Sequence, residues 1–130
     1  MALVFLSLGD VVEIHADQLE RYGGASGIRD IGLLESAVAM PEAGFGGEYL
    51  HGDVFEMAAA YLFHIVRNHP FVDGNKRTGA VAAIVFLELN GHELRSSERA
   101  LETLVSSVAE GKKRRHEIAV FLRAHCRPPQ

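Results

Sequence analysis

The chain has 130 residues, 48% of them hydrophobic, and a formal net charge of −4 at pH 7, so we expect one hydrophobic core and a single domain over residues 1–130. The acidic excess argues against direct nucleic-acid binding, because affinity for a phosphate backbone needs a surplus of Lys and Arg. With one cysteine, Cys126, and no apolar run near the roughly 20 residues that span a bilayer, we expect a cytoplasmic protein without internal disulfides or membrane contact.

The first third of the chain predicts two helices. Residues 3–6 form a short extended segment that leads to Ser7, a suitable helix cap. The next residues predict a helix that ends at Gly23 and Gly24, with one apolar stripe formed by Val11, Ile14, His15, Leu19 and Tyr22. Because His15 lies on that stripe, we interpret it as a hydrogen-bonded core histidine or a support for a nearby site. A second helix should span roughly Ile31 to Met40 and end before Pro41.

A glycine-rich segment, residues 43–50, follows Pro41. It predicts a mobile loop or a small hairpin that carries two aromatic side chains, Phe45 and Tyr49. An ordinary connector would have the same composition.

The centre of the chain predicts two buried helices. Residues 54–66 and 79–89 are apolar on nearly every face, which is typical of helices in the middle of a bundle. Two more helices are expected at about 97–109 and 114–124, with the basic run 112–116 as a solvated helix start. We therefore predict an all-α bundle of about six helices with a central antiparallel pair.

A polar loop, HPFVDGNKRT from His69 to Thr78, joins the two central helices. Pro70 disfavours the helical conformation at the preceding residue, so the first of these helices should end near Asn68 or His69. Asn75 is a good cap for a helix that starts at Lys76. The unpaired N–H groups of that first turn, with Lys76 and Arg77, would form an anion pocket.

The loop also carries groups suited to phosphate chemistry. Arg77 offers a fork for two phosphate oxygens, and Lys76 offers a mobile point charge. Asp73 suits a Mg²⁺ ion that bridges phosphates, and His69 is the natural acceptor of a hydroxyl proton. A plain Asp-Gly-Asn turn followed by solvated cations is the structural alternative. Because all these groups fall in one turn, we favour a phosphate-binding or phosphoryl-transfer site.

The same loop resembles the signature of the Fic/Doc (Fido) superfamily, His-Pro-Phe-x-Asp/Glu-Gly/Ala-Asn-Gly/Lys-Arg. Further segments resemble its Doc (death on curing) branch, namely residues 14–15, 20–24, 27–30, 33–37 and 86–91. The resemblance implies that His69 is the general base and that Asp73 coordinates Mg²⁺. It also implies that Gly74 and Asn75 help to form an anion hole and that Arg77 binds a nucleotide phosphate. Phe71 would be the core anchor that fixes the loop. The segment 43–50 resembles a flap that positions the target peptide over the active site.

Lys76 is the position that separates two activities within this superfamily. Doc-type proteins carry Lys there, and the resemblance implies transfer of the ATP γ-phosphate to a threonine of elongation factor Tu, which blocks translation. It further implies a toxin whose partner is a Phd-like antitoxin, bound in a groove beside the active site. The alternative is transfer of AMP to a protein hydroxyl, because AMP-transferring enzymes usually carry Gly at the position of Lys76 and often share Gly74. A second alternative is a non-catalytic interaction module of the same fold.

One short pattern could indicate self-inhibition. Residues 106–111 match the Ser/Thr-x-x-x-Glu-Gly/Asn pattern by which some Fic enzymes inhibit themselves, and this would make Glu110 an inhibitory residue. A helix that ends at Glu110 and Gly111 explains the same residues, and we favour that interpretation.

Overall fold

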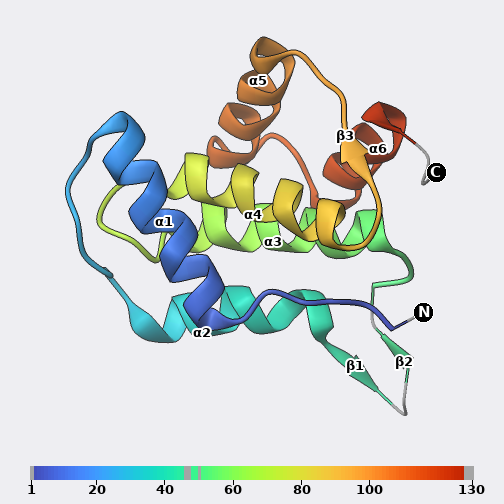
Figure 1. Ribbon diagram of the computed structural model, residues 1–130, viewed down its shortest axis with the longest axis horizontal. Coiled ribbons are helices and arrows are strands. Elements are labelled where there is room, and N and C mark those ends of the chain that lie inside the picture. The colour runs from blue at the N-terminus through green and yellow to red at the C-terminus, as the bar shows by residue number, and fades with distance from the viewer. Residues whose placement is uncertain (1, 46–47, 50, 128–130) are drawn as a thin grey trace.

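Six α-helices account for most of the part of the chain that the computed structural model describes, residues 2–45, 48–49 and 51–127 (Figure 1). The elements in order are α1 (Leu8–Tyr22), α2 (Ile31–Ala39), the 3₁₀-helix η1 (Met40–Glu42), β1 (Gly44–Phe45), β2 (Glu48–Tyr49), α3 (Val54–Asn68), α4 (Asn75–Leu89), β3 (Glu93–Leu94), α5 (Glu98–Ala109), α6 (Arg115–His125) and β4 (Cys126–Arg127). The prediction of an all-α bundle is confirmed.

The core lies along the antiparallel pair α3 and α4 (Figure 1). Both helices contribute side chains that are almost fully buried. Those of α3 include Met57, Tyr61, Leu62 and Ile65, and those of α4 include Ala82, Ala83, Phe86 and Leu87. Helices α2 and α6 pack on α3, while α1 packs on α4. The two helices that were predicted to be buried therefore form the centre of the bundle.

Local signals set the ends of most helices as predicted. Ser7 caps α1 through a reciprocal pair of bonds with Asp10, and Gly23, at φ 79°, ends the same helix. Helix α2 ends at Ala39, and Pro41 lies in the 3₁₀-turn that follows. Residues 3–6 join no sheet. The N–H of Val4 donates to Oδ1 of Asn90, and Nδ2 of Asn90 donates to the carbonyl oxygen of Val4.

Two small antiparallel strand pairs complete the structure. β1 pairs with β2, with Phe45 opposite Glu48, and this confirms the small hairpin. β3 pairs with β4, with Leu94 opposite Cys126, and was not predicted. Among the described residues, no helix is long and apolar enough to cross a lipid bilayer.

The position of the β1–β2 hairpin corrects the prediction of a flap over the active site. The hairpin precedes the first turn of α3, whereas the HPFVDGNKRT loop follows its last turn, at the opposite end of the helix (Figure 1). A helix of 15 residues is roughly 22 Å long. Tyr49 packs against Phe5 at a centroid distance of 5.5 Å. Because only residues 50–53 separate β2 from α3, the hairpin cannot reach the loop.

Candidate active site

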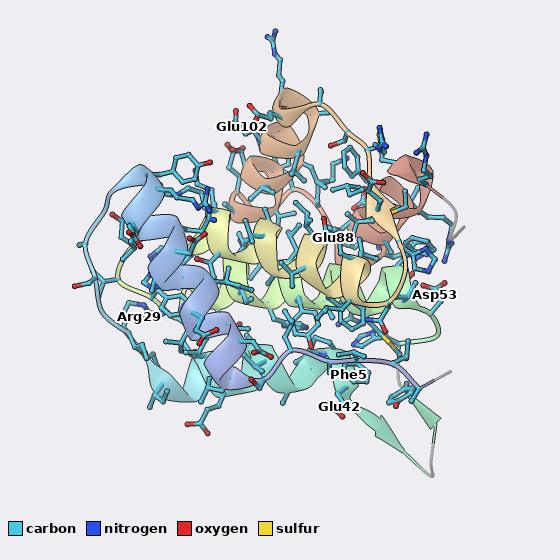
Figure 2. The ribbon with its side chains drawn as sticks, in the orientation of Figure 1. Phe5, Arg29, Glu42, Asp53, Glu88 and Glu102 are labelled. Atoms are coloured by element: carbon cyan, nitrogen blue, oxygen red, sulfur yellow. The ribbon has the colours of Figure 1, made fainter. Side chains whose placement is uncertain are left out.

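The loop between α3 and α4 begins with a residue in an unusual backbone conformation. α3 ends at Asn68, and His69 lies in the left-handed region at φ 52°, which costs free energy for a residue with a side chain. Arg29 offsets this cost, because its Nε–H donates to the carbonyl oxygen of His69 at 2.6 Å and its Nη2 donates to that of Asn68 at 2.9 Å. In Figure 2, Arg29 lies at the opposite end of the molecule from Asp53, which caps the start of α3.

The segment that carries Arg29 runs along the loop like a second strand. The N–H groups of Arg29 and Asp30 donate to the carbonyl oxygen of Pro70 at 2.7 and 3.0 Å, and the N–H of Val72 donates to that of Gly27 at 3.0 Å. Residues 27–30, rather than the β1–β2 hairpin, therefore flank the predicted site. Sequence reasoning missed this contact, because nothing in the composition of residues 27–30 specifies a partner.

Phe71 and His15 hold the loop from the core side. Phe71 is fully buried, and its ring stacks on the imidazole of His15 at 3.8 Å and 5°. His15 lies 2.8 Å from the carbonyl oxygen of Asp73 through Nε2, and since a carbonyl only accepts, Nε2 must carry the hydrogen. Phe71 therefore lies in the core beneath the loop, and His15 is hydrogen-bonded to the loop backbone.

Asn75 occupies a different position from the one predicted. The N-cap of α4 is Gly74, in the left-handed conformation at φ 79°, and Asn75 is the first helical residue. The side chain of Asn75 is buried and bonds back to Phe71: Oδ1 accepts from the N–H at 2.9 Å, and Nδ2 donates to the carbonyl oxygen at 2.9 Å. Asn75 therefore closes the loop on itself instead of capping the helix.

These two bonds also determine how Asn75 contacts His69. Because the orientation of the amide is fixed by Phe71, the remaining Nδ2 hydrogen is directed at Nδ1 of His69, 3.1 Å away. Nδ1 is then the acceptor, and the neutral imidazole carries its hydrogen on Nε2. The basic lone pair of His69 is thus engaged by Asn75 in this structure.

Asp73 presents an ionised carboxylate at the mouth of the site. Its Oδ2 accepts the N–H of Ala25 at 3.1 Å, and its Oδ1 accepts the N–H of Gly74 at 2.8 Å. These two hydrogen bonds hold the pKa of Asp73 below its usual value, and the bond from Ala25 has the larger effect. Lone pairs remain on both oxygens, and a single exposed carboxylate suits Mg²⁺, which is commonly bound by one or two carboxylates together with substrate phosphates. The residues present therefore fit that ion.

Six of the predicted site residues, those of the loop from His69 to Arg77 other than Phe71, line one cavity of about 600 Å³. Its wall is formed by Val66, Arg67, His69, Asp73, Gly74, Asn75, Lys76, Arg77 and Ala109. Three cationic side chains and a single carboxylate line this cavity, although the whole chain is acidic. The first turn of α4 adds N–H groups and the positive end of the helix dipole. The cavity is therefore suited to an anion with several charges.

A second cavity, of about 510 Å³, adjoins the first at Lys76 and Arg77. It runs between the end of α1, the outer face of α4 and α5, and is lined by Gln18, Tyr22, Lys76, Arg77, Ala80, Val81, Ile84, Glu98, Leu101, Glu102, Val105 and Ser106. Arg77 is held at the junction by a bond from Nη2 to the carbonyl oxygen of Gly23 at 2.9 Å, and its guanidinium lies 5.5 Å from the ring of Tyr22. A ligand in this groove would therefore touch the same two cations as a ligand in the loop cavity.

Glu110 lies near the site but does not contact Arg77 in this structure. It pairs with Lys112 at 2.8 Å, and this hydrogen bond, more than the charge of Lys76, lowers the pKa of Glu110. Gly111 follows at φ 78°. The pattern at residues 106–111 therefore has the geometry of a helix end.

The sequence matches known proteins over most of its length. Residues 5–87 match the family model described as Fic/DOC family. The chain is 44% identical over 91 residues to the protein named Toxin Doc of Mycolicibacterium smegmatis, covering 68% of this chain and 69% of that protein. It is 33% identical over 102 residues to Protein kinase doc of Escherichia phage P1, covering 78% of this chain and 80% of that protein.

Proposed function

The chain belongs to the Fic/DOC family, on the branch of the Doc toxins, and we propose that it transfers the γ-phosphate of ATP to a protein hydroxyl as the toxin of a toxin–antitoxin pair. The observation that carries this proposal is the loop cavity, which His69, Asp73, Lys76 and Arg77 line together at the N-terminus of α4. A base, a carboxylate and an anion pocket at one point are the groups that phosphoryl transfer requires.

The chemical step follows from these positions. The phosphates of ATP lie against Lys76, Arg77 and the N–H groups at the start of α4, which stabilise the charge on the transferring group. Asp73 would hold a Mg²⁺ ion, which would supply positive charge against the phosphates. The hydroxyl oxygen of the target forms a bond to the γ-phosphorus while the bond to the leaving ADP oxygen breaks. His69 accepts the hydroxyl proton at Nδ1, so the bond from Asn75 opens as the target arrives.

The position of Lys76 favours γ-phosphate transfer over AMP transfer. Its exposed side chain lines both cavities. AMP-transferring relatives usually have glycine at this position, which leaves space for the nucleotide phosphates. Gly74 gives no support to AMP transfer, because its conformation at φ 79° explains the glycine. A Cβ there would also lie 3.3 Å from Cδ2 of Leu19, which is closer than ordinary contact.

Labelled ATP separates these activities. The protein is incubated with whole-cell lysate and with ATP labelled either at the γ- or at the α-phosphate, and His69→Ala is run beside it. The proposal expects label on protein from the γ-position alone and none with the variant. Label from the α-position would indicate AMP transfer. A His69→Ala variant that is as toxic as the wild type would favour the non-catalytic interaction module instead.

From the resemblance to Doc proteins, we propose a threonine of elongation factor Tu as the target and a Phd-like antitoxin as the partner. The groove between α4 and α5 supports the second assignment. Its lining includes the apolar side chains of Val81, Ile84 and Leu101. It also includes the two cations that it shares with the loop cavity, and Glu98 and Glu102 of α5, the latter labelled in Figure 2. Such a groove suits the apolar face of an amphipathic helix.

Growth assays test the groove. Ile84→Glu should leave the toxin active but no longer neutralised by a co-expressed antitoxin. Val120→Glu, on the exposed face of α6, is the matched control and should be neutralised like the wild type. Neutralisation of Ile84→Glu to the wild-type extent would contradict the assignment.

A further inference from the structure

Arg67 is a cation of the loop cavity that the signature loop does not contain. It lies in the last turn of α3, two residues before His69, and its side chain is exposed. It lines the cavity together with Lys76 and Arg77, but it comes from α3, whereas the other two belong to the first turn of α4. The cavity therefore has cations from two helices.

The contacts of Arg67 leave its charge without a counterion. Nη1 donates to the carbonyl oxygen of Ala109, at the end of α5, at 3.2 Å. Within the described part of the chain, Arg67 forms no ion pair, whereas Arg21, Arg95 and Arg123 each pair with a carboxylate. One N–H is enough to tie α3 to α5, and a guanidinium has five.

The neighbouring backbone leaves room beside the guanidinium. Gly111 has φ 78°, and a Cβ added there would lie 3.2 Å from Nη1 of Arg67 and 3.7 Å from Cζ. A side chain at this position would crowd the guanidinium. The backbone just after α5 therefore lies beside Arg67 without a side chain between them.

We propose that Arg67 binds the polyphosphate of the nucleotide from the end of α3, together with Lys76 and Arg77 at the start of α4. The inference rests on the proposed function and extends it, because it adds a phosphate ligand from α3. A chain of linked phosphates has oxygens on all sides, so it can contact cations from two helices at once. The planar fork of Arg67 is suited to two such oxygens.

Arg67→Gln tests the charge separately from the tie to α5, because the glutamine amide keeps an N–H donor. Binding of ATP with Mg²⁺, of inorganic tripolyphosphate and of adenosine is measured by calorimetry on the wild type and the variant. We expect affinity for ATP and tripolyphosphate to fall by about tenfold or more, with adenosine unchanged. Arg67→Lys should retain more affinity than Arg67→Gln. Arg99→Ala, on α5 and outside both cavities, should bind like the wild type.

Thermal unfolding of each variant without ligand accompanies the binding data, and we expect Arg67→Gln to unfold near the wild-type temperature. Wild-type affinity of Arg67→Gln for ATP and tripolyphosphate would overturn the inference and leave Arg67 as a tie between two helices. If the wild type binds no ATP, the proposed function fails together with this inference. If ATP binds but no protein is phosphorylated, the proposed function fails and the role of Arg67 in binding stands.

Discussion

The close contact between α3 and α4 at Gly79 sets the spacing of the two helices that hold the active-site loop. An alanine Cβ at this position would lie 2.8 Å from Cγ2 of Val66 and 3.2 Å from the carbonyl oxygen of Leu62. Gly→Ala inside a helix ordinarily stabilises a protein by about 1 kcal/mol. Overpacking of a buried helix contact costs about 1–3 kcal/mol, and a backbone oxygen cannot rotate away. Because the carbonyl oxygen of Leu62 is fixed, we place the cost in the upper part of that range, at about 2–3 kcal/mol, so Gly79→Ala should lower the free energy of unfolding by about 1–2 kcal/mol.

Urea denaturation followed by circular dichroism measures this change, and the chain supplies a matched control. Gly9 lies in the first turn of α1, where an added Cβ would meet only the Ser7 hydroxyl, at 3.8 Å. Gly9→Ala should therefore leave stability unchanged or raise it by up to about 1 kcal/mol. In a Val66→Ala background, the penalty of Gly79→Ala should shrink, since one of the two close contacts is gone. A Gly79→Ala protein as stable as the wild type would refute the reasoning from helix spacing.

Three further substitutions test other parts of the structure. Burial, followed by the charge of a nearby arginine, lowers the pKa of His64 from 6.5 to about 4. Between these two pH values the unfolded chain binds a proton at His64 that the folded chain does not, so the free energy of unfolding should fall as the pH drops from 6.5 to 4. His64→Gln should remove part of this pH dependence, as measured by urea titrations at several pH values. Arg29→Ala should reduce kcat for phosphate transfer more than it raises the KM for ATP, because it releases the backbone of His69, whereas Arg21→Ala, at a surface ion pair, should change neither. Asn75→Asp should move the hydrogen of the neutral imidazole of His69 from Nε2 to Nδ1, and nitrogen NMR spectra that show the same tautomer in both proteins would contradict the orientation of the Asn75 amide.

Much of the fold followed from residue patterns because the signals were local. The apolar segments of α3 and α4, the Ser7 cap and the Gly23 helix end each act within a few residues, so the sequence predicted them directly. The loop was placed between the buried helices for the same reason. The position of Pro70 correctly predicted that α3 ends just before His69.

The errors concern contacts between distant residues. The flap prediction assigned the hairpin of Phe45 and Tyr49 to the active site, although the short connection to α3 keeps it at the other end of that helix. The contact of residues 27–30 with the loop joins backbone groups far apart in the sequence, as the bonds from the N–H groups of Arg29 and Asp30 to the carbonyl oxygen of Pro70 show. Asn75 was assigned as a cap because asparagine commonly caps helices, but the buried backbone of Phe71 takes both ends of its amide.

The most direct test of the proposed activity is the intact mass of elongation factor Tu after incubation with this protein, ATP and Mg²⁺, with His69→Ala as control. We predict that the mass increases by one phosphate with the wild type and stays unchanged with the variant. An increase by one AMP would contradict γ-phosphate transfer, and an unchanged mass with the active wild type would contradict elongation factor Tu as the target.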